Sequence, residues 1–299
     1  MIIKEALHQA SKTLAAHPIE DAPLEAELLL MHILGIDRAK LYTRLGEELP
    51  ADDAEALAQL VDRRLSHEPT AYIVGHREFF GHDFYVTPGV LIPRPESELL
   101  VEEALFELWE RSGRGKPLGE LLLTDDKPPT CEKIADVGTG SGAIAISLAL
   151  ILPMAKIYAT DISAPALEIA RVNCQRHGVQ DRVYLLEGDL LEPLPGPVDI
   201  IVANLPYIGD EDWSELSAEI RMYEPTVALA GGRDGLDKMR QLLSTVNEKL
   251  RTGGLILLEI GPGQGQAAAT LAQDLFPGAR IGLARDLGGR ERVLKVVLT

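Results

Sequence analysis

The tetrapeptide Asn204-Leu205-Pro206-Tyr207 follows the apolar run VDIIVA at residues 198–203. The side-chain oxygen of Asn204 and the backbone carbonyl of Leu205 are two acceptors that match the two N–H groups of a planar amide or amine. Pro206 fixes the turn and restricts Leu205 to extended geometry, and Tyr207 offers a ring that can pack on a flat group. We therefore predict a rigid loop at the end of a buried strand, in which polar acceptors stand beside an aromatic ring and can hold a flat polar group.

A glycine-rich turn, DVGTGSG at residues 136–142, follows a second apolar run. Its glycines allow a sharp turn and a close approach of backbone to ligand near the N-terminus of the next helix. We expect Gly138, Thr139, Gly140, Ser141 and Gly142 to contact a cofactor. Taken alone, the motif also fits dinucleotide-binding proteins.

Carboxylates stand at the ends of the next two apolar runs. Asp161 lies nineteen residues after Gly142, where a carboxylate either accepts from ribose hydroxyls or caps the helix that begins near Ser163. Asp189 is placed to accept from the amino group of an adenine, and Leu190 beside it can supply backbone contacts or a side chain that faces the ring. Since ligands of open α/β sheets bind where strand ends converge, these residues predict a site for an adenosine cofactor.

The elements that must position these residues alternate between strands and helices from residue 134 onward. The runs IADVG, IYATD, VYLLEGD, VDIIVAN and LILLEIG are continuously apolar, as in parallel strands that are buried on both faces. The terminal segments ARIGLAR and RVLKVVL suit an antiparallel pair at the edge. We predict a doubly wound α/β domain over residues 95–299.

Two further parts precede this domain. Residues 1–70 have helical periodicity and net negative charge, and they form either a packing module or a docking domain for a protein substrate. Aromatic and β-branched residues broken by glycines predict a β-hairpin linker at 71–94. The segment 111–130 is rich in Gly, Pro and charge, which is typical of a surface loop.

Composition narrows the function. The net charge of −17 argues against non-specific nucleic-acid binding, which depends on basic residues. Neither the two cysteines nor the scattered histidines have metal-ligand spacing, so we expect no metal. The strongly apolar stretch AIAISLALIL at 143–152 is too short to span a bilayer. We expect a cytoplasmic monomer with no membrane partner and no stable nucleic-acid partner.

The order of these motifs resembles that of S-adenosylmethionine-dependent methyltransferases that modify planar NH2 groups, whose usual tetrapeptide is Asn-Pro-Pro-Tyr; Leu205 departs from it. Three further segments resemble the HemK/PrmC family of protein-(glutamine-N5) methyltransferases. They are EPTAYIVGHREFFGHDFYVTPGVLIPRPESELLVE at 68–102, EIRMYEPTVALAGGRDGLDKMRQLL at 219–243 and LGGRERVLKVVL at 287–298.

The resemblance implies a helical bundle, a β-hairpin and a class I methyltransferase domain that act on the Gly-Gly-Gln glutamine of peptide-chain release factors. S-adenosyl-L-methionine would be the cofactor and S-adenosyl-L-homocysteine the product. By resemblance, residues 138–142, Asp161, Leu190 and Asn204 contact the cofactor, and residues 204–207 hold the glutamine. Arg94 and Glu96 would lie near the pocket entrance or form a salt bridge within their loop.

The sequence alone is also compatible with three other activities. A ribosomal-protein glutamine methyltransferase would share the tetrapeptide, although RMYEPTVALAGGRDGL favours release factors. A nucleic-acid adenine N6-methyltransferase would also use such a loop, but the acidic charge disfavours it. A nicotinamide-dependent oxidoreductase would leave Asn204-Leu205-Pro206-Tyr207 unexplained.

Overall fold

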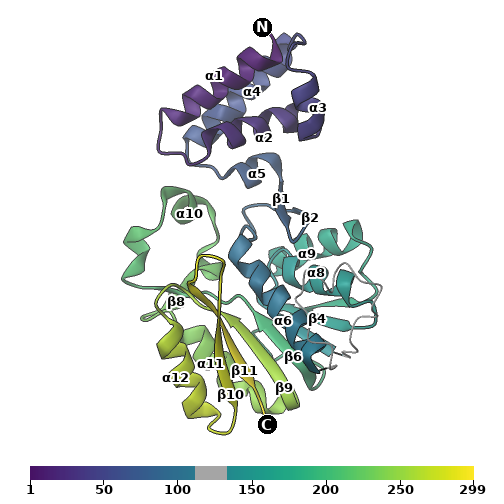
Figure 1. The fold of residues 1–299 in the computed structure, drawn as a ribbon, viewed down its shortest axis with the longest axis vertical. Helices are drawn as coiled ribbons and strands as arrows, with labels where there is room; N and C mark the ends of the chain where they lie inside the picture. The colour runs from purple at the N-terminus through teal and green to yellow at the C-terminus, as the bar shows by residue number, and fades with distance from the viewer. Residues whose placement is uncertain (112–132) are drawn as a thin grey trace. The chain divides into compact units, whose positions relative to one another are not determined.

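The computed structural model describes residues 1–111 and 133–299 (Figure 1). Most of the segment 111–130, which we predict to be a loop, lies outside the described residues. The chain forms two compact units. One comprises Met1–His76 and Leu216–Glu224, and the other comprises Arg77–Glu215 and Pro225–Thr299.

The first unit is helical. Its helices are α1 (Ile3–Ala15), α2 (Ala22–Leu34), α3 (Arg38–Thr43), α4 (Ala51–Leu65), α5 (Thr70–Val74) and α10 (Ala218–Tyr223). Apolar residues at helical spacing, among them Leu14, Leu29 and Leu30, form its core. The sequence favours these helices locally, since Asp37 caps α3 by accepting from the Lys40 amide at 2.8 Å.

Helix α5 corrects one detail of the predicted hairpin. Residues 71–74, which we assigned to the hairpin segment, are helical. Pro69 precedes this helix, and Gly75 ends it with a φ of +79°, so a glycine in the left-handed region stops the helix before the strands begin. The hairpin strands are β1 (His76–Phe79) and β2 (His82–Tyr85), which form a two-stranded sheet.

Helix α10 belongs to the N-terminal unit although it lies late in the chain. The guanidinium of Arg64, which is buried, pairs with Glu25 and donates to Glu219 at 2.8 Å. The hydroxyl of Tyr223 donates to the carbonyl of Ser66 at 2.8 Å. Polar contacts between residues that are more than 150 positions apart in the sequence therefore hold this segment against α4.

A seven-stranded sheet forms the centre of the second unit (Figure 1). Its order is β10 (Arg280–Arg285), β11 (Glu291–Val297), β9 (Leu250–Glu259), β6 (Val198–Ala203), β3 (Lys133–Val137), β4 (Lys156–Asp161) and β5 (Val183–Glu187). Strands β9, β6, β3, β4 and β5 are parallel, and β11 is antiparallel to both β9 and β10. The predicted α/β fold class and its antiparallel edge are confirmed.

Helices cover both faces of this sheet, as continuous hydrophobicity requires. Helices α6 (Glu98–Arg111), α8 (Ala143–Ile151) and α9 (Ala164–Arg176) lie on one side, and α11 (Asp237–Thr245) and α12 (Gly265–Leu275) lie on the other (Figure 1). Within β6, Ile200 and Val202 pack on the side of α6, α8 and α9, whereas Ile201 and Ala203 pack on the side of α11 and α12. No helix of the described residues is long and apolar enough to cross a membrane.

Short elements complete the second unit. They are η1 (Pro95–Ser97), η2 (Asp212–Glu215), η3 (Thr226–Ala228), η4 (Val246–Glu248), β7 (Ile208–Gly209) and β8 (Ala230–Gly232). The 3-10 turn η1 leads directly into α6, and β7 pairs with β8 in a small parallel sheet.

The strand order creates a crevice beside β3. The chain runs from β3 outward to β4 and β5, and then returns to place β6 and β9 on the opposite side of β3. Val137 at the end of β3 pairs with Ala203 at the end of β6. The glycine-rich turn and Asn204 therefore leave the sheet side by side, at the switch point where α/β proteins bind ligands.

Candidate active site

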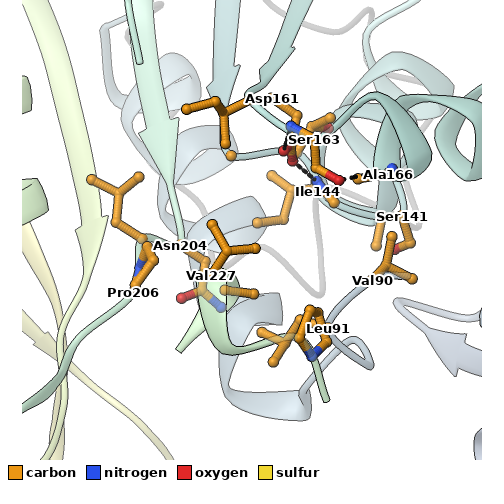
Figure 2. A pocket seen from close by; sticks show the side chains of 18 of the residues that line it. Val90, Leu91, Ser141, Ile144, Asp161, Ser163, Ala166, Asn204, Pro206 and Val227 are labelled. Atoms are coloured by element: carbon orange, nitrogen blue, oxygen red, sulfur yellow. Dashed lines mark hydrogen bonds between the residues drawn. The ribbon is translucent and has the colours of Figure 1, made fainter. Parts of the chain in front are cut away.

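A pocket at this switch point is lined wholly by residues of the second unit (Figure 2). Ten of the predicted site residues line it: Gly138, Thr139, Gly140, Ser141, Asp161, Asp189, Leu190, Asn204, Leu205 and Pro206. Gly142 and Tyr207 are not among the lining residues. Residues of four strand ends thus meet around one cavity.

The glycine-rich turn presents open backbone to the pocket. Gly140 has a φ of +55°, and a Cβ at this position would meet nothing within 4 Å, so the space beside it is available to a ligand. Gly142 has a different surrounding, because a Cβ there would lie 3.3 Å from the Cβ of Ala170 in α9. In this structure Gly142 brings α8 and α9 close together.

Asp161 ties the glycine-rich turn to the start of α9. Its Oδ2 accepts from the Gly140 amide at 2.8 Å, and its Oδ1 accepts from the Ser163 amide at 2.9 Å. Burial raises the pKa of Asp161, and these amide hydrogen bonds oppose the rise. Since each carboxylate oxygen has a second lone pair, support of the helix start and binding of a ligand hydroxyl are compatible.

The next residue, Ile162, was not among our predicted site residues. It lines the pocket, yet the residue is 57% exposed. An exposed isoleucine inside a pocket offers a flat apolar surface to a planar ring. Its position directly after Asp161 in the sequence could have identified Ile162 as a pocket residue.

Asp189 and Leu190 close another side of the pocket. Oδ2 of Asp189 accepts from Gln241 Nε2 at 2.6 Å, and Nζ of Lys238 lies 3.6 Å from Oδ1. Leu190 has a φ of +48°, and its carbonyl accepts from the hydroxyl of Thr160 at 2.8 Å. The predicted acceptor at Asp189 is thus held in place by side chains of α11.

Asn204 is held by a buried serine that the sequence analysis did not identify. Its Nδ2 donates to Oγ of Ser97 at 2.9 Å, and the Ser97 hydroxyl donates to Oε2 of Glu259 at 2.5 Å. This leaves Oδ1 of Asn204 as the acceptor that is available to a ligand. Leu205 is buried, with its side chain in the vicinity of Gly138.

Tyr207 is fixed through both its side chain and its backbone. Its phenol is buried near Glu259, and its carbonyl accepts from Gln264 Nε2 at 3.0 Å. Burial raises the pKa of Tyr207, as does the nearby charge of Glu259, so the phenol stays protonated near neutral pH. The role of its ring toward a substrate stays a prediction.

Arg94 and Glu96 have separate positions. Arg94 lines the pocket, whereas Oε1 of Glu96 lies 4.0 Å from Nη2 of Arg292. Among the described residues, no cluster of three or more His, Cys, Asp or Glu side chains could hold a metal ion.

The sheet order, the antiparallel edge and the glycine-rich turn after the central strand define a class I methyltransferase. A methyltransferase of Pyrococcus furiosus has the same fold, with a TM-score of 0.52 and 18% identity over 80% of this chain and 98% of that one. Residues 5–75 match the family model of the PrmC N-terminal domain, and residues 118–224 match that of the methyltransferase small domain.

Two relatives identify the family. The chain is 44% identical to a release factor glutamine methyltransferase of Moorella thermoacetica, over 98% of this chain and 97% of the relative. It is 40% identical to a release factor glutamine methyltransferase of Geobacter sulfurreducens, over 88% and 86% of the two chains. The protein belongs to the release factor glutamine methyltransferase family.

Proposed function

We propose that the protein is a cytoplasmic enzyme that methylates the side-chain nitrogen, N5, of the glutamine in the Gly-Gly-Gln loop of peptide-chain release factors. Membership of the family supports this substrate. The observation that carries the proposal is the fixed orientation of Asn204, whose Nδ2 is engaged by Ser97 while its Oδ1 is left to accept from a ligand N–H.

S-adenosyl-L-methionine is the proposed methyl donor, and the lining of the pocket fits it. The open backbone at Gly140 suits close approach of a ligand, the spare lone pairs of Asp161 suit ribose hydroxyls, and Ile162 suits the face of an adenine. When bound, the cofactor supplies an electrophilic methyl carbon on a sulfonium sulfur and leaves as S-adenosyl-L-homocysteine.

The residues of the chain then have to orient a weak nucleophile. The lone pair of an amide nitrogen is delocalised into its carbonyl, so binding must hold the nitrogen in a reactive position. Oδ1 of Asn204 and the carbonyl of Leu205 accept its two N–H groups and favour the positive charge that develops there as the N–C bond forms and the C–S bond breaks. One of the two N–H protons is then lost to solvent, which leaves a neutral N-methylamide. Pro206 keeps these acceptors in place, and Tyr207 packs on the flat amide.

A single labelling experiment tests this function. The protein is incubated with isotopically labelled S-adenosyl-L-methionine, purified release factor, ribosomal proteins and rRNA, and mass spectrometry locates the added methyl group. We expect one labelled methyl group on the Gly-Gly-Gln glutamine. A release factor in which alanine replaces that glutamine is the control. Label on rRNA or on a ribosomal protein instead would contradict the proposal.

A further inference from the structure

A continuous line of hydrogen bonds leads from the tetrapeptide loop to the end of β9. Asn204 donates to Ser97, and Ser97 donates to Glu259. The phenol of Tyr207 lies close enough to the same carboxyl group to affect its pKa. Ser97 and Glu259 are only 4% and 3% exposed, so bulk water does not compete for these contacts.

The direction of this line matters because an asparagine amide has a donor end and an acceptor end. An ionised carboxylate can only accept, so Ser97 must donate its proton to Glu259. A lone pair of Ser97 Oγ is then the acceptor for Nδ2 of Asn204, and Oδ1 is left for the substrate.

Protonation of Glu259 would remove this constraint. A carboxylic acid can donate to Ser97, and Ser97 can then donate to Oδ1 of Asn204 after the amide flips. The flipped amide would present its NH2 group toward the NH2 group of the substrate. Two donors cannot form a hydrogen bond with each other, so this arrangement is unproductive.

We propose that Glu259 is a positioning residue that sets the orientation of the Asn204 amide through Ser97, and that methyl transfer requires Glu259 to be ionised. The inference rests on the proposed function, because it assigns Oδ1 of Asn204 to an N–H of the substrate glutamine.

The surroundings of Glu259 place its titration near neutral pH. The charged and titratable groups that act on it come from η1, the tetrapeptide loop and β11, and they are Glu96, Tyr207 and Arg292. Two further charged groups lie beside these: Arg94 acts on Tyr207, and Asp286 pairs with Arg292. Burial raises the pKa of Glu259 to about 7. The charge of Glu96 adds to the rise, while the hydrogen bond from Ser97, the nearby phenol of Tyr207 and the charge of Arg292 oppose it.

Glu259→Gln is the central test, since it keeps the shape of the side chain and removes its titration. For the wild type, kcat/KM toward release factor should rise about tenfold per pH unit below pH ~7 and level off above it, because one ionisation is required. The variant should lack this rise. At a pH of about 8 its kcat should be about tenfold lower, while its calorimetric affinity for S-adenosyl-L-methionine should be unchanged.

Two further variants test the route of the effect. If Glu259 acts through Ser97, the double variant Ser97→Ala/Glu259→Gln should be no slower than Ser97→Ala alone. Glu96→Gln removes a neighbouring negative charge that raises the pKa of Glu259. It should therefore shift the rise in kcat/KM to lower pH without abolishing it.

A spectroscopic readout needs no substrate. In ¹⁵N-labelled protein, the side-chain NH2 resonances of Asn204 should titrate near pH ~7 in the wild type and should not titrate in Glu259→Gln. A wild type that methylates no release factor would contradict the proposed function and would leave this spectrum as the test. Titration of Asn204 that persists in Glu259→Gln, an unchanged pH profile, or additive losses in the double variant would overturn the inference.

Discussion

Replacement of Gly235 by alanine tests whether the tetrapeptide loop needs its present backbone position. Gly235 has a φ of +76°, and a Cβ there would overlap the carbonyl oxygen of Tyr207 and Nε2 of Gln264. Those two atoms share a hydrogen bond of 3.0 Å. Gln264 is itself held, because its Oε1 accepts from the amide of Gly261 at 2.8 Å. The loop therefore cannot admit the methyl group unless Tyr207 or Gln264 moves.

The expected magnitudes follow from these contacts. A left-handed conformation costs an ordinary residue about 1–2 kcal/mol, and loss of the Gln264–Tyr207 hydrogen bond adds about 1 kcal/mol. Gly235→Ala should thus lower the free energy of unfolding by about 2–3 kcal/mol. The effect on catalysis should be greater, since displacement of a positioned group by about 1 Å lowers a rate by about 100-fold. Affinity for S-adenosyl-L-methionine should stay unchanged because Gly235 does not line the pocket.

Gly253→Ala is the matched control. Gly253 has a φ of +73°, but a Cβ there would meet nothing within 4 Å, so the substitution has a similar backbone cost without the overlap. Urea denaturation, release factor methylation and calorimetric titration of the cofactor should be compared for both variants. If Gly235→Ala methylates as fast as Gly253→Ala, the reasoning about Tyr207 is refuted.

Three other substitutions have definite expected outcomes. Asn204→Ala should nearly abolish methyl transfer in single-turnover assays and leave calorimetric cofactor affinity mostly intact; a variant of full speed would contradict the assigned role. Arg64→Ala leaves two carboxylates of the N-terminal unit without their shared cation, so urea unfolding should show a loss of about 3 kcal/mol, and a loss near zero would mean that the cluster is not stabilising. Burial raises the pKa of Asp136 to about 7, so the wild type should lose stability as pH rises from about 4 through about 7. Asp136→Asn should reduce this loss in unfolding measurements at low and high pH, the remainder belonging to the other carboxyl groups whose pKa is raised, Glu259, Asp161 and Glu102; an unchanged pH dependence would contradict the raised pKa.

The parallel sheet could be predicted because its strands are apolar on both faces and end at recognisable polar residues. Strand β9 shows the limit of this signal. It begins at Leu250, five residues before its apolar run, and residues 251–253 are exposed. These residues are polar or glycine and lie in solvent, so they lack the apolar pattern of a buried strand. The sequence therefore did not indicate where β9 begins.

The position of Leu216–Glu224 could not be predicted for a different reason. This segment joins the N-terminal unit through Arg64 and Ser66, and polar contacts between distant positions leave no periodic pattern in one sequence. The predicted boundaries at residues 70 and 94 stay predictions.

Ser97 and Glu259 were missed because they lie 107 and 55 residues from Asn204 in the sequence. The strand order brings Glu259 beside Asn204, whereas Ser97 reaches both from the turn η1, outside the sheet. Strands β6 and β9 are neighbours, and Ala203 pairs with Leu258, so Asn204 and Glu259 are the next residues at the same end of two adjacent strands. The apolar run LILLEIG contains one acidic residue, at the point where its strand ends. Asp161 and Asn204 were identified by that same feature, and the rule that polar strand ends converge therefore applied to Glu259 as soon as β9 was placed beside β6.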